Sequence, residues 1–283
     1  MMNNIILNER QRAEDIIRTG DLGKHVANSL SILARYYHKY EGLKNKQLYN
    51  KLDGFMADYY ADYLPYNWSI TIDSQVKKAE KYPLIEIDYI PVTKNELEII
   101  KGLNDIMLER LAFTYLVLAK FYNLRNSDNN GWVVLQPSAV FTLANLSKSR
   151  LEQYEFIHEL KELGFIELAK RIDNPNIRVT FIDNDSEVAV KVTQMVNVGY
   201  YYLKYIGKDI KPCPRCGTLM RSRFKLCKDC RDKPAMRYKN CVDCGLDFLV
   251  PVNAAKKCRC NACQKEYRKK YQRELMRKRK SQI

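Results

Sequence analysis

Hydrophobic residues in the first 80 positions of the chain recur at helical spacing. The spacing predicts three helices, over residues 8–19, 22–40 and 44–60. The third shows the pattern most clearly, with apolar side chains at i, i+4, i+7 and i+11: Leu48, Leu52, Phe55 and Tyr59. A short β-like run over 84–90 ends at Pro91. We therefore predict a helical N-terminal region over residues 1–92.

The pattern from residue 93 onward predicts a second domain, over 93–206. Thr93 and Glu96 form a capping-box signature that begins a helix, and Asn104 is placed to cap the next one. The expected order is then helix, short strand, two helices and a two-stranded hairpin: 105–123, 132–135, 137–144, 148–163, 165–171 and 177–182. The 148–163 helix has a predicted buried stripe: Leu151, Tyr154, Ile157, Leu160 and Leu163. A strand (187–192) and a tyrosine-rich helix (200–205) follow.

This order of elements is similar to that of the winged-helix fold. The sequence from Leu160 to Glu167 resembles the end of a recognition helix that runs into the wing, as in many bacterial regulators. The resemblance implies that the 148–163 helix enters the major groove of DNA by its N-terminal end. The base-reading positions that it implies are Ser147, Lys148, Ser149, Arg150 and Gln153. The phosphate contacts that it implies in the wing are Lys170, Arg171 and Arg178.

Winged helices also serve as platforms that bind other proteins, and the charge of this region favours that alternative. Residues 1–207 carry a net charge of −1. Glu152, Glu155 and Glu159 belong to the same predicted helix as the base-reading positions, and they would repel phosphates if they faced DNA. Both interpretations remain open at this point.

The positive charge of the chain is concentrated at one end. Of the formal net charge of +15, residues 208–283 contribute 23 Lys/Arg and 7 Asp/Glu, a net of +16. Such an asymmetry is typical of a protein that binds a polyanion, most often a nucleic acid. The alternative is a solvated segment that only aids solubility.

All nine cysteines lie in the same basic segment, and eight of them form four CxxC pairs: Cys213/Cys216, Cys227/Cys230, Cys241/Cys244 and Cys260/Cys263. The pattern of Lys211–Gly217 recurs 28 residues later in Lys239–Gly245. A CxxC turn (a knuckle) that is followed by glycine therefore alternates twice with a CxxC turn that is not. We therefore predict two successive four-cysteine sites, although cross-bracing of the first pair with the third is an alternative. Cys258 is interpreted as a spare thiol, or else as a replacement for Cys260.

The spacing resembles that of the zinc ribbons common in nucleic-acid-processing proteins. Zn²⁺ prefers four soft ligands in a tetrahedron, and two facing CxxC turns supply them. A closed four-cysteine shell leaves no open coordination position, so we expect two structural Zn²⁺ ions and no catalytic one. Two such sites lower the net charge of the segment to about +12, which keeps it strongly basic.

The last residues, 264–280, contain no glycine or proline and predict a helix. Tyr267, Tyr271 and Leu275 form one apolar stripe, and the other faces are basic. Such a helix can follow a phosphate backbone. The residues that we expect to contact phosphate are Arg268, Lys269, Arg273 and Arg277. The alternative is a frayed, solvated end.

Several function classes lack their signatures in this sequence. It contains no GxxxxGK[ST] phosphate loop, no GxSxG nucleophile turn and only three histidines, so we do not expect an enzyme or a small-molecule substrate. A run of about 18 apolar residues and a secretory signal are also missing, which favours a cytoplasmic protein that does not enter membranes, or a nucleoid-associated one if it binds DNA.

These observations predict a mainly α protein with small β elements, organised as a helical N-terminal region, a winged helix-turn-helix domain, two small zinc ribbons and a basic C-terminal helix. The predicted domains are 1–92, 93–206, 207–233 and 234–283. The predicted function is a regulator of transcription or replication initiation, from a phage or mobile element, that binds double-stranded DNA. One alternative is an adaptor that holds a protein of the replication or transcription machinery; another is an RNA-binding protein.

Overall fold

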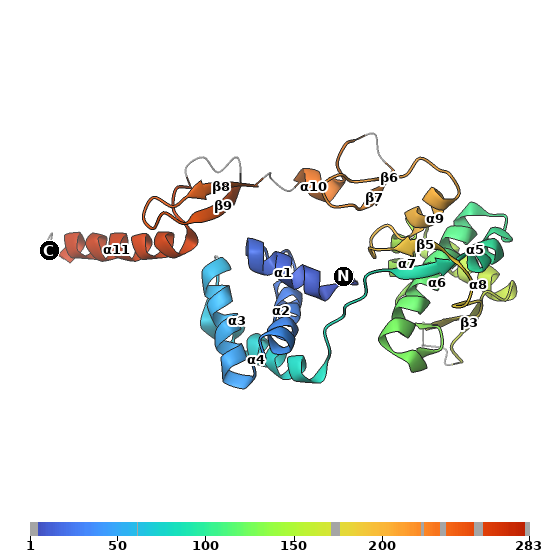
Figure 1. Ribbon diagram of the computed structural model, residues 1–283, viewed down its shortest axis with the longest axis horizontal. Coiled ribbons are helices and arrows are strands. Elements are labelled where there is room, and N and C mark those ends of the chain that lie inside the picture. Colours follow the sequence, from blue (N-terminus) through green and yellow to red (C-terminus); the bar gives the residue numbers. More distant parts are fainter. Residues whose placement is uncertain are drawn as a thin grey trace. The chain divides into compact units, whose positions relative to one another are not determined.

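The computed structural model describes residues 5–60, 62–170, 176–221, 224–232, 236–251 and 257–280. These residues are mainly helical with small antiparallel sheets, as predicted (Figure 1). The chain folds as two compact units. One comprises residues 1–8 and 85–230, and the other comprises residues 9–84 and 231–283.

The N-terminal helices lie where the periodicity predicts them, and a fourth follows. Their bounds are α1 Glu9–Thr19, α2 Val26–Tyr40, α3 Asn45–Tyr59 and α4 Pro65–Lys81. Leu30, Leu48 and Ile72 are fully buried, because apolar residues at helical spacing from three of these helices pack together. Arg35 on α2 adds a bidentate ion pair to Glu9 on α1, at 2.6 and 2.7 Å.

A two-stranded sheet links distant parts of the first unit. Strand β1 (Ile90–Thr93) pairs antiparallel with β5 (Val188–Val192). The prediction of a strand over 84–90 that stops at Pro91 is wrong, because Pro91 lies inside β1 opposite Lys191. A proline lacks the backbone N–H, but an edge strand tolerates the missing hydrogen bond.

Helix α5 (Lys94–Lys101) begins with the predicted capping box, in which Thr93 accepts from the backbone N–H of Glu96. The cap of α6 (Ile106–Arg125) is Asp105 and not Asn104. Asp105 has an extended backbone, and its carboxylate accepts from the N–H groups of the second and third helical residues at 2.7 and 2.9 Å. Asn104 instead occupies the left-handed region, with φ +51°, which is incompatible with the extended N-cap conformation.

Helix α6 is the buried centre of the first unit, and the remaining elements pack around it. They are β2 Trp132–Val133, α7 Pro137–Leu143, α8 Arg150–Glu162, β3 Ile166–Leu168 and β4 Ile177–Val179, preceded by the short 3₁₀ turn η1 Ser127–Asn129. The strands form one antiparallel sheet in the order β2-β4-β3. Helix α9 (Gly199–Tyr205) packs on α6, where the buried Tyr202 hydroxyl donates to Glu109 at 2.9 Å.

The predicted buried stripe of α8 is wrong in three of its five positions. Ile157 and Leu160 are buried, but Leu151, Tyr154 and Leu163 are 70%, 51% and 54% exposed. Ile157 is six positions after Leu151, which corresponds to a rotation of about 600° along the helix, so the side chains of Leu151 and Ile157 point about 120° apart. Residues that are three positions apart, as in the expected stripe, are therefore rotated progressively around the helix, and only some of them face the core.

The cysteine-containing segment forms two small modules. The first contains β6 (Lys211–Pro212), β7 (Leu219–Met220) and α10 (Lys228–Asp232). The second contains the hairpin of β8 (Met236–Asn240) with β9 (Asp247–Pro251), followed by α11 (Asn261–Lys280). The predicted C-terminal helix is thus present, and Figure 1 shows it as one uninterrupted helix.

Candidate metal centres and nucleic-acid surface

Each module begins with the same cysteine turn. Gly217 and Gly245 have φ values of +73° and +70°, a conformation that glycine adopts without strain. Their N–H groups donate to the carbonyl oxygens of Cys213 and Cys241 at 2.8 and 2.9 Å. These turns bring the two cysteines of each CxxC pair to the same side of the loop.

The structure brings the eight paired cysteines together in two sequential groups of four. In each group the Sγ atoms lie within 4.8 Å of one another: Cys213, Cys216, Cys227 and Cys230, then Cys241, Cys244, Cys260 and Cys263. The grouping is the successive one that the repeat predicts, and cross-bracing is not observed.

The sulfur–sulfur distances fit a metal ion and exclude disulfides. The Sγ atoms of Cys216 and Cys227 are 3.6 Å apart, and those of Cys244 and Cys260 are 3.8 Å apart. A tetrahedron with metal–sulfur bonds of about 2.3 Å has edges of about 3.8 Å, whereas a disulfide bond is about 2.05 Å long. Each group is therefore able to hold one metal ion.

Backbone N–H groups prepare one thiolate in each group. The N–H of Cys227 points at the sulfur of Cys213 at 3.4 Å, and the N–H of Cys260 points at that of Cys241 at 3.3 Å. These hydrogen bonds lower the pKa of both Cys213 and Cys241 to about 6. Desolvation raises the pKa of Cys230. The backbone of each turn thus favours the thiolate form of one sulfur in its group.

Cys258 lies outside both groups. Its carbonyl oxygen accepts from the N–H of Val242 at 3.0 Å, so its backbone supports the first knuckle of the second module. Cys260 occupies the position in the sulfur cluster, and the interpretation of Cys258 as a replacement for it finds no support in this geometry.

The first module is attached to the other elements of the first unit, called the helical body below, by buried and polar contacts that the sequence pattern did not reveal. The side-chain amide of Gln194 donates to the carbonyl oxygen of Cys216 at 2.8 Å and accepts from Thr218 at 2.9 Å. Asn197 donates to the carbonyl oxygen of Leu219 at 2.8 Å. Leu219 also packs in a small core with Leu203 and Ile210.

The second module has different neighbours: it belongs to the same unit as α3, where the side chain of Asn261 donates to the carbonyl oxygen of Asp58 at 3.2 Å. Arg259 pairs with Asp243 at 2.8 Å, and its guanidinium lies 4.1 Å from the centre of the Tyr267 ring. This contact joins the metal-binding knuckle to the first turns of α11. Tyr238 on β8 is 65% exposed.

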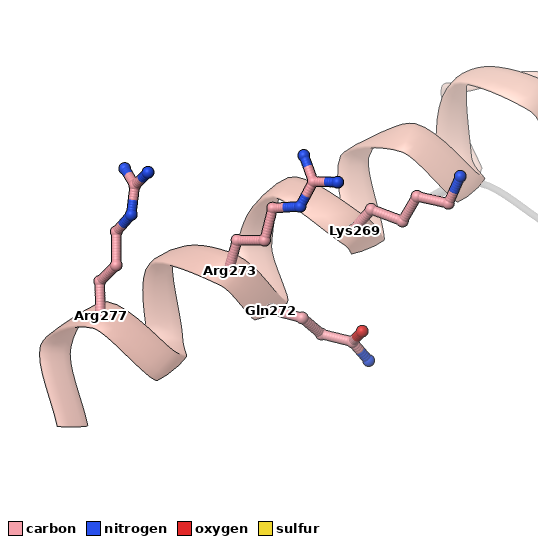
Figure 2. Close-up of a pocket in the computed structure, with 4 residues that line it drawn as sticks. All are labelled: Lys269, Gln272, Arg273 and Arg277. Carbon is pink, nitrogen blue, oxygen red and sulfur yellow. The ribbon is translucent and has the colours of Figure 1, made fainter. Parts of the chain in front are cut away.

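Helix α11 presents a row of cations. Lys269, Arg273 and Arg277 are four residues apart, which spaces them about 6 Å along the helix axis. Together with Gln272 they line a shallow, open hollow, and Figure 2 shows the two arginines extending to the same side of the helix. Arg268, the fourth predicted contact, is also exposed.

The positions expected to read bases have mixed environments. Ser147, Ser149 and Arg150 are exposed, but Ser149 also caps α8 by accepting from the N–H of Glu152. Three of the five positions have side-chain partners within the protein: Lys148 pairs with Glu152 at 3.1 Å, Gln153 donates to the carbonyl oxygen of Lys148 at 2.9 Å, and the exposed Arg150 donates to the hydroxyl of Tyr154 at 3.4 Å.

In the predicted wing, Lys170 is exposed. Arg178 pairs with Glu167 at 3.2 Å and donates to the carbonyl oxygen of Asn130. Arg171 lies outside the described residues. The exposed face of α8 also carries the carboxylates of Glu155, Glu159 and Glu162.

The comparisons with known proteins found no match. No protein-family model, curated protein or solved structure matches the chain. Within the part of the chain that the structure describes, no helix has the length and apolar character needed to cross a membrane. The function must therefore be inferred from the cysteine groups and the charged surfaces themselves.

Proposed function

We propose that the chain is a DNA-binding protein in which two structural Zn²⁺ ions organise the basic C-terminal segment, and α11 contacts the phosphate backbone. Four thiolates at tetrahedral distances favour Zn²⁺, which would hold each module in one conformation without taking part in catalysis. The modules are too small to bury a sizeable core, so the metal would supply most of their folding free energy. The role is one of binding and not of catalysis.

The observation that carries this proposal is the row of Lys269, Arg273 and Arg277 directly after the second cysteine group. Helix α11 has nine basic and two acidic residues over its 20 positions. Arg273 and Arg277 extend to one side of the helix, beside Lys269, which pairs with Glu266 at 3.0 Å. Contact of these cations with a row of phosphates would release the condensed counterions of DNA. The predicted affinity is therefore strongly dependent on salt.

A salt titration of DNA binding tests this proposal. We expect the double variant Arg273→Ala/Arg277→Ala to lower the slope of log K against log [salt] by about 2, because each phosphate contact contributes about 0.9. Lys77 and Lys78 are exposed on α4 and provide the control double variant Lys77→Ala/Lys78→Ala. Equal slopes for all three proteins would contradict a phosphate contact by α11.

We also propose that residues 105–182 form a winged helix. The succession of α6, β2, α7, α8, β3 and β4, with the sheet order β2-β4-β3, supports this assignment. In that fold α8 is the recognition helix, and Arg150 at its exposed N-terminal end is the residue best placed to reach a guanine edge. Arg150→Ala should then reduce sequence preference more than total affinity, as measured by selection from a random DNA pool. Sites selected by such a pool would also test the proposed role in transcription or replication initiation of a phage or mobile element.

The exposed face of α8 favours a second candidate function, that of an adaptor for a replication or transcription protein. Leu151 and Tyr154 are largely exposed beside Glu155 and Glu159, and α8 has four acidic and two basic residues. An apolar and acidic face is better suited to a protein than to DNA. The adaptor would be favoured if neither the wild type nor Arg150→Ala showed any sequence preference on duplex DNA. The affinities of the two proteins for duplex DNA would then be equal.

A further inference from the structure

The second cysteine module exposes aromatic rings among its cations. Tyr238 is 65% exposed on β8 and Tyr271 is 56% exposed on α11. The cation that shares a side of α11 with Tyr271 is Arg268, three residues earlier and also exposed. An exposed ring beside a cation is the combination that holds an unpaired base and its phosphate.

The β8–β9 hairpin gives Tyr238 an open position. Tyr238 is opposite Leu249, and alternate residues of a strand point to opposite faces. The neighbouring pair, Arg237 and Val250, belongs to the other face, where Val250 is fully buried. The face of Tyr238 is therefore the outer one. On this face the side chains of Asn240 and Asp247 are hydrogen-bonded to each other at 2.6 Å.

Two tyrosines on α11 differ in what covers them. Tyr267 and Tyr271 are four residues apart and share one side of the helix. The guanidinium of Arg259 lies over the ring of Tyr267, so this ring belongs to the packing of the module. Tyr271 is one helical turn further along, where its ring is more exposed than that of Tyr267.

We infer that this module binds single-stranded nucleic acid in preference to duplex, with bases stacking on Tyr238 and Tyr271 while α11 contacts the phosphates. Bases in a duplex are already stacked on each other, so an outward-facing ring gains a partner only where a base is unpaired or unstacked. The chemistry is shared by DNA and RNA strands. This inference rests on the proposed function and names the form of nucleic acid that the same module prefers.

Fluorescence anisotropy with the zinc-loaded full chain tests the inference. The probes are a labelled 20-nucleotide DNA strand, the RNA strand of the same sequence and the 20-base-pair DNA duplex, all compared over the same series of salt concentrations. We expect the wild type to bind both single strands more tightly than the duplex. Tyr238→Leu and Tyr271→Leu should each weaken single-strand binding by about five- to a hundred-fold, the range for loss of one stacked base, and change duplex binding less than about two-fold.

The controls separate stacking from folding. Tyr238→Phe and Tyr271→Phe keep the ring and should retain single-strand affinity. Tyr66→Leu removes a ring that is 76% exposed on α4, and it should change nothing. Metal analysis of each variant shows whether both sites are still loaded; a variant that loses metal is replaced by the corresponding alanine or serine variant that keeps it.

The outcomes distinguish the two proposals. Tighter duplex binding, or losses that are equal on all three probes, would overturn the inference. Tyrosine variants that bind like the wild type, with salt dependence intact, would also overturn it and leave the proposed function standing. If none of the three probes binds in a salt-dependent way, the proposed function itself fails. A difference between the DNA and RNA strands would identify which single strand the module prefers.

Discussion

The two cysteine modules have the same chemistry and different surroundings. Both begin with a cysteine turn closed by a left-handed glycine, and both place a backbone N–H on the sulfur of the first cysteine. The first module packs on the helical body through Gln194, Asn197 and Leu219. The second continues into the basic helix α11. The comparison indicates that a metal site fixes only local geometry, whereas the residues around it decide what the fixed geometry is used for.

The largest difference between the modules is expected when one metal site is destroyed. Cys213→Ser should remove one zinc and lower the unfolding temperature of the helical body, because the first module is part of that unit. Cys241→Ser should also remove one zinc but leave the body as stable as in the wild type, while nucleic-acid affinity falls at least ten-fold. Metal analysis and calorimetry check both variants. Equal effects on the body would show that the modules are interchangeable.

The polar contacts of the first module should have the next largest effect. Asn197→Ala removes the side-chain bonds to Leu219 and to Asn145 and places alanine at a left-handed φ of +53°, so we expect a loss of about 1–3 kcal/mol in the free energy of unfolding of the body. The matched control in the second module is Asn240→Ala, whose bond to Asp247 is exposed. Denaturant titration measures both, and a control that costs as much as Asn197→Ala would contradict the asymmetry.

Acidification is expected to lower the zinc affinity of the two modules in the same way. The pKa of Cys213 and of Cys241 is lowered to about 6, so their thiolates are present above pH 6 and are lost as the pH falls through 6. Metal binding must displace protons from the thiols that are still protonated. The slope of log K for zinc against pH should therefore increase by one proton per site below pH 6. A chelator competition assay at several pH values would show a constant slope if these two sulfurs ionise like free thiols.

The smallest effect is expected at the junction of the second module. Arg259→Ala removes the ion pair with Asp243 and the contact with the Tyr267 ring. Because both contacts are partly exposed, we expect a loss of about 0.5–1 kcal/mol in module stability and about a three-fold loss in nucleic-acid affinity. Arg10→Ala serves as the control, since Arg10 on α1 also pairs with a carboxylate, that of Glu14, and also lies over a tyrosine ring, that of Tyr40. A loss larger than that of Arg273→Ala/Arg277→Ala would place the binding surface at the knuckle instead of on α11.

The sequence was most informative where one local rule determines the structure. Helical spacing predicted α1, α2 and α3, and the capping box at Thr93 marked the start of α5. The CxxC repeat predicted the sulfur groups, because four soft ligands must converge on one point. Each of these features depends on residues close together in the chain.

The predictions failed where tertiary packing decides. The exposed Leu151 and Tyr154 are apolar, so the periodicity of α8 gave no sign that the core lies on the side of Ile157 and Leu160. Asn104 and Asp105 are both good caps, and the left-handed backbone at Asn104 selects Asp105. Gln194 and Asn197 carry no motif; their role arises only because the first module folds back onto them.

Hydrogen–deuterium exchange of the zinc-loaded full chain, with and without saturating nucleic acid, tests the central claim most directly. We predict slower exchange on binding in residues 257–280 and in β8, with little change in the first cysteine module. Protection confined to α8 and the first module, with α11 exchanging as in the free protein, would contradict the account.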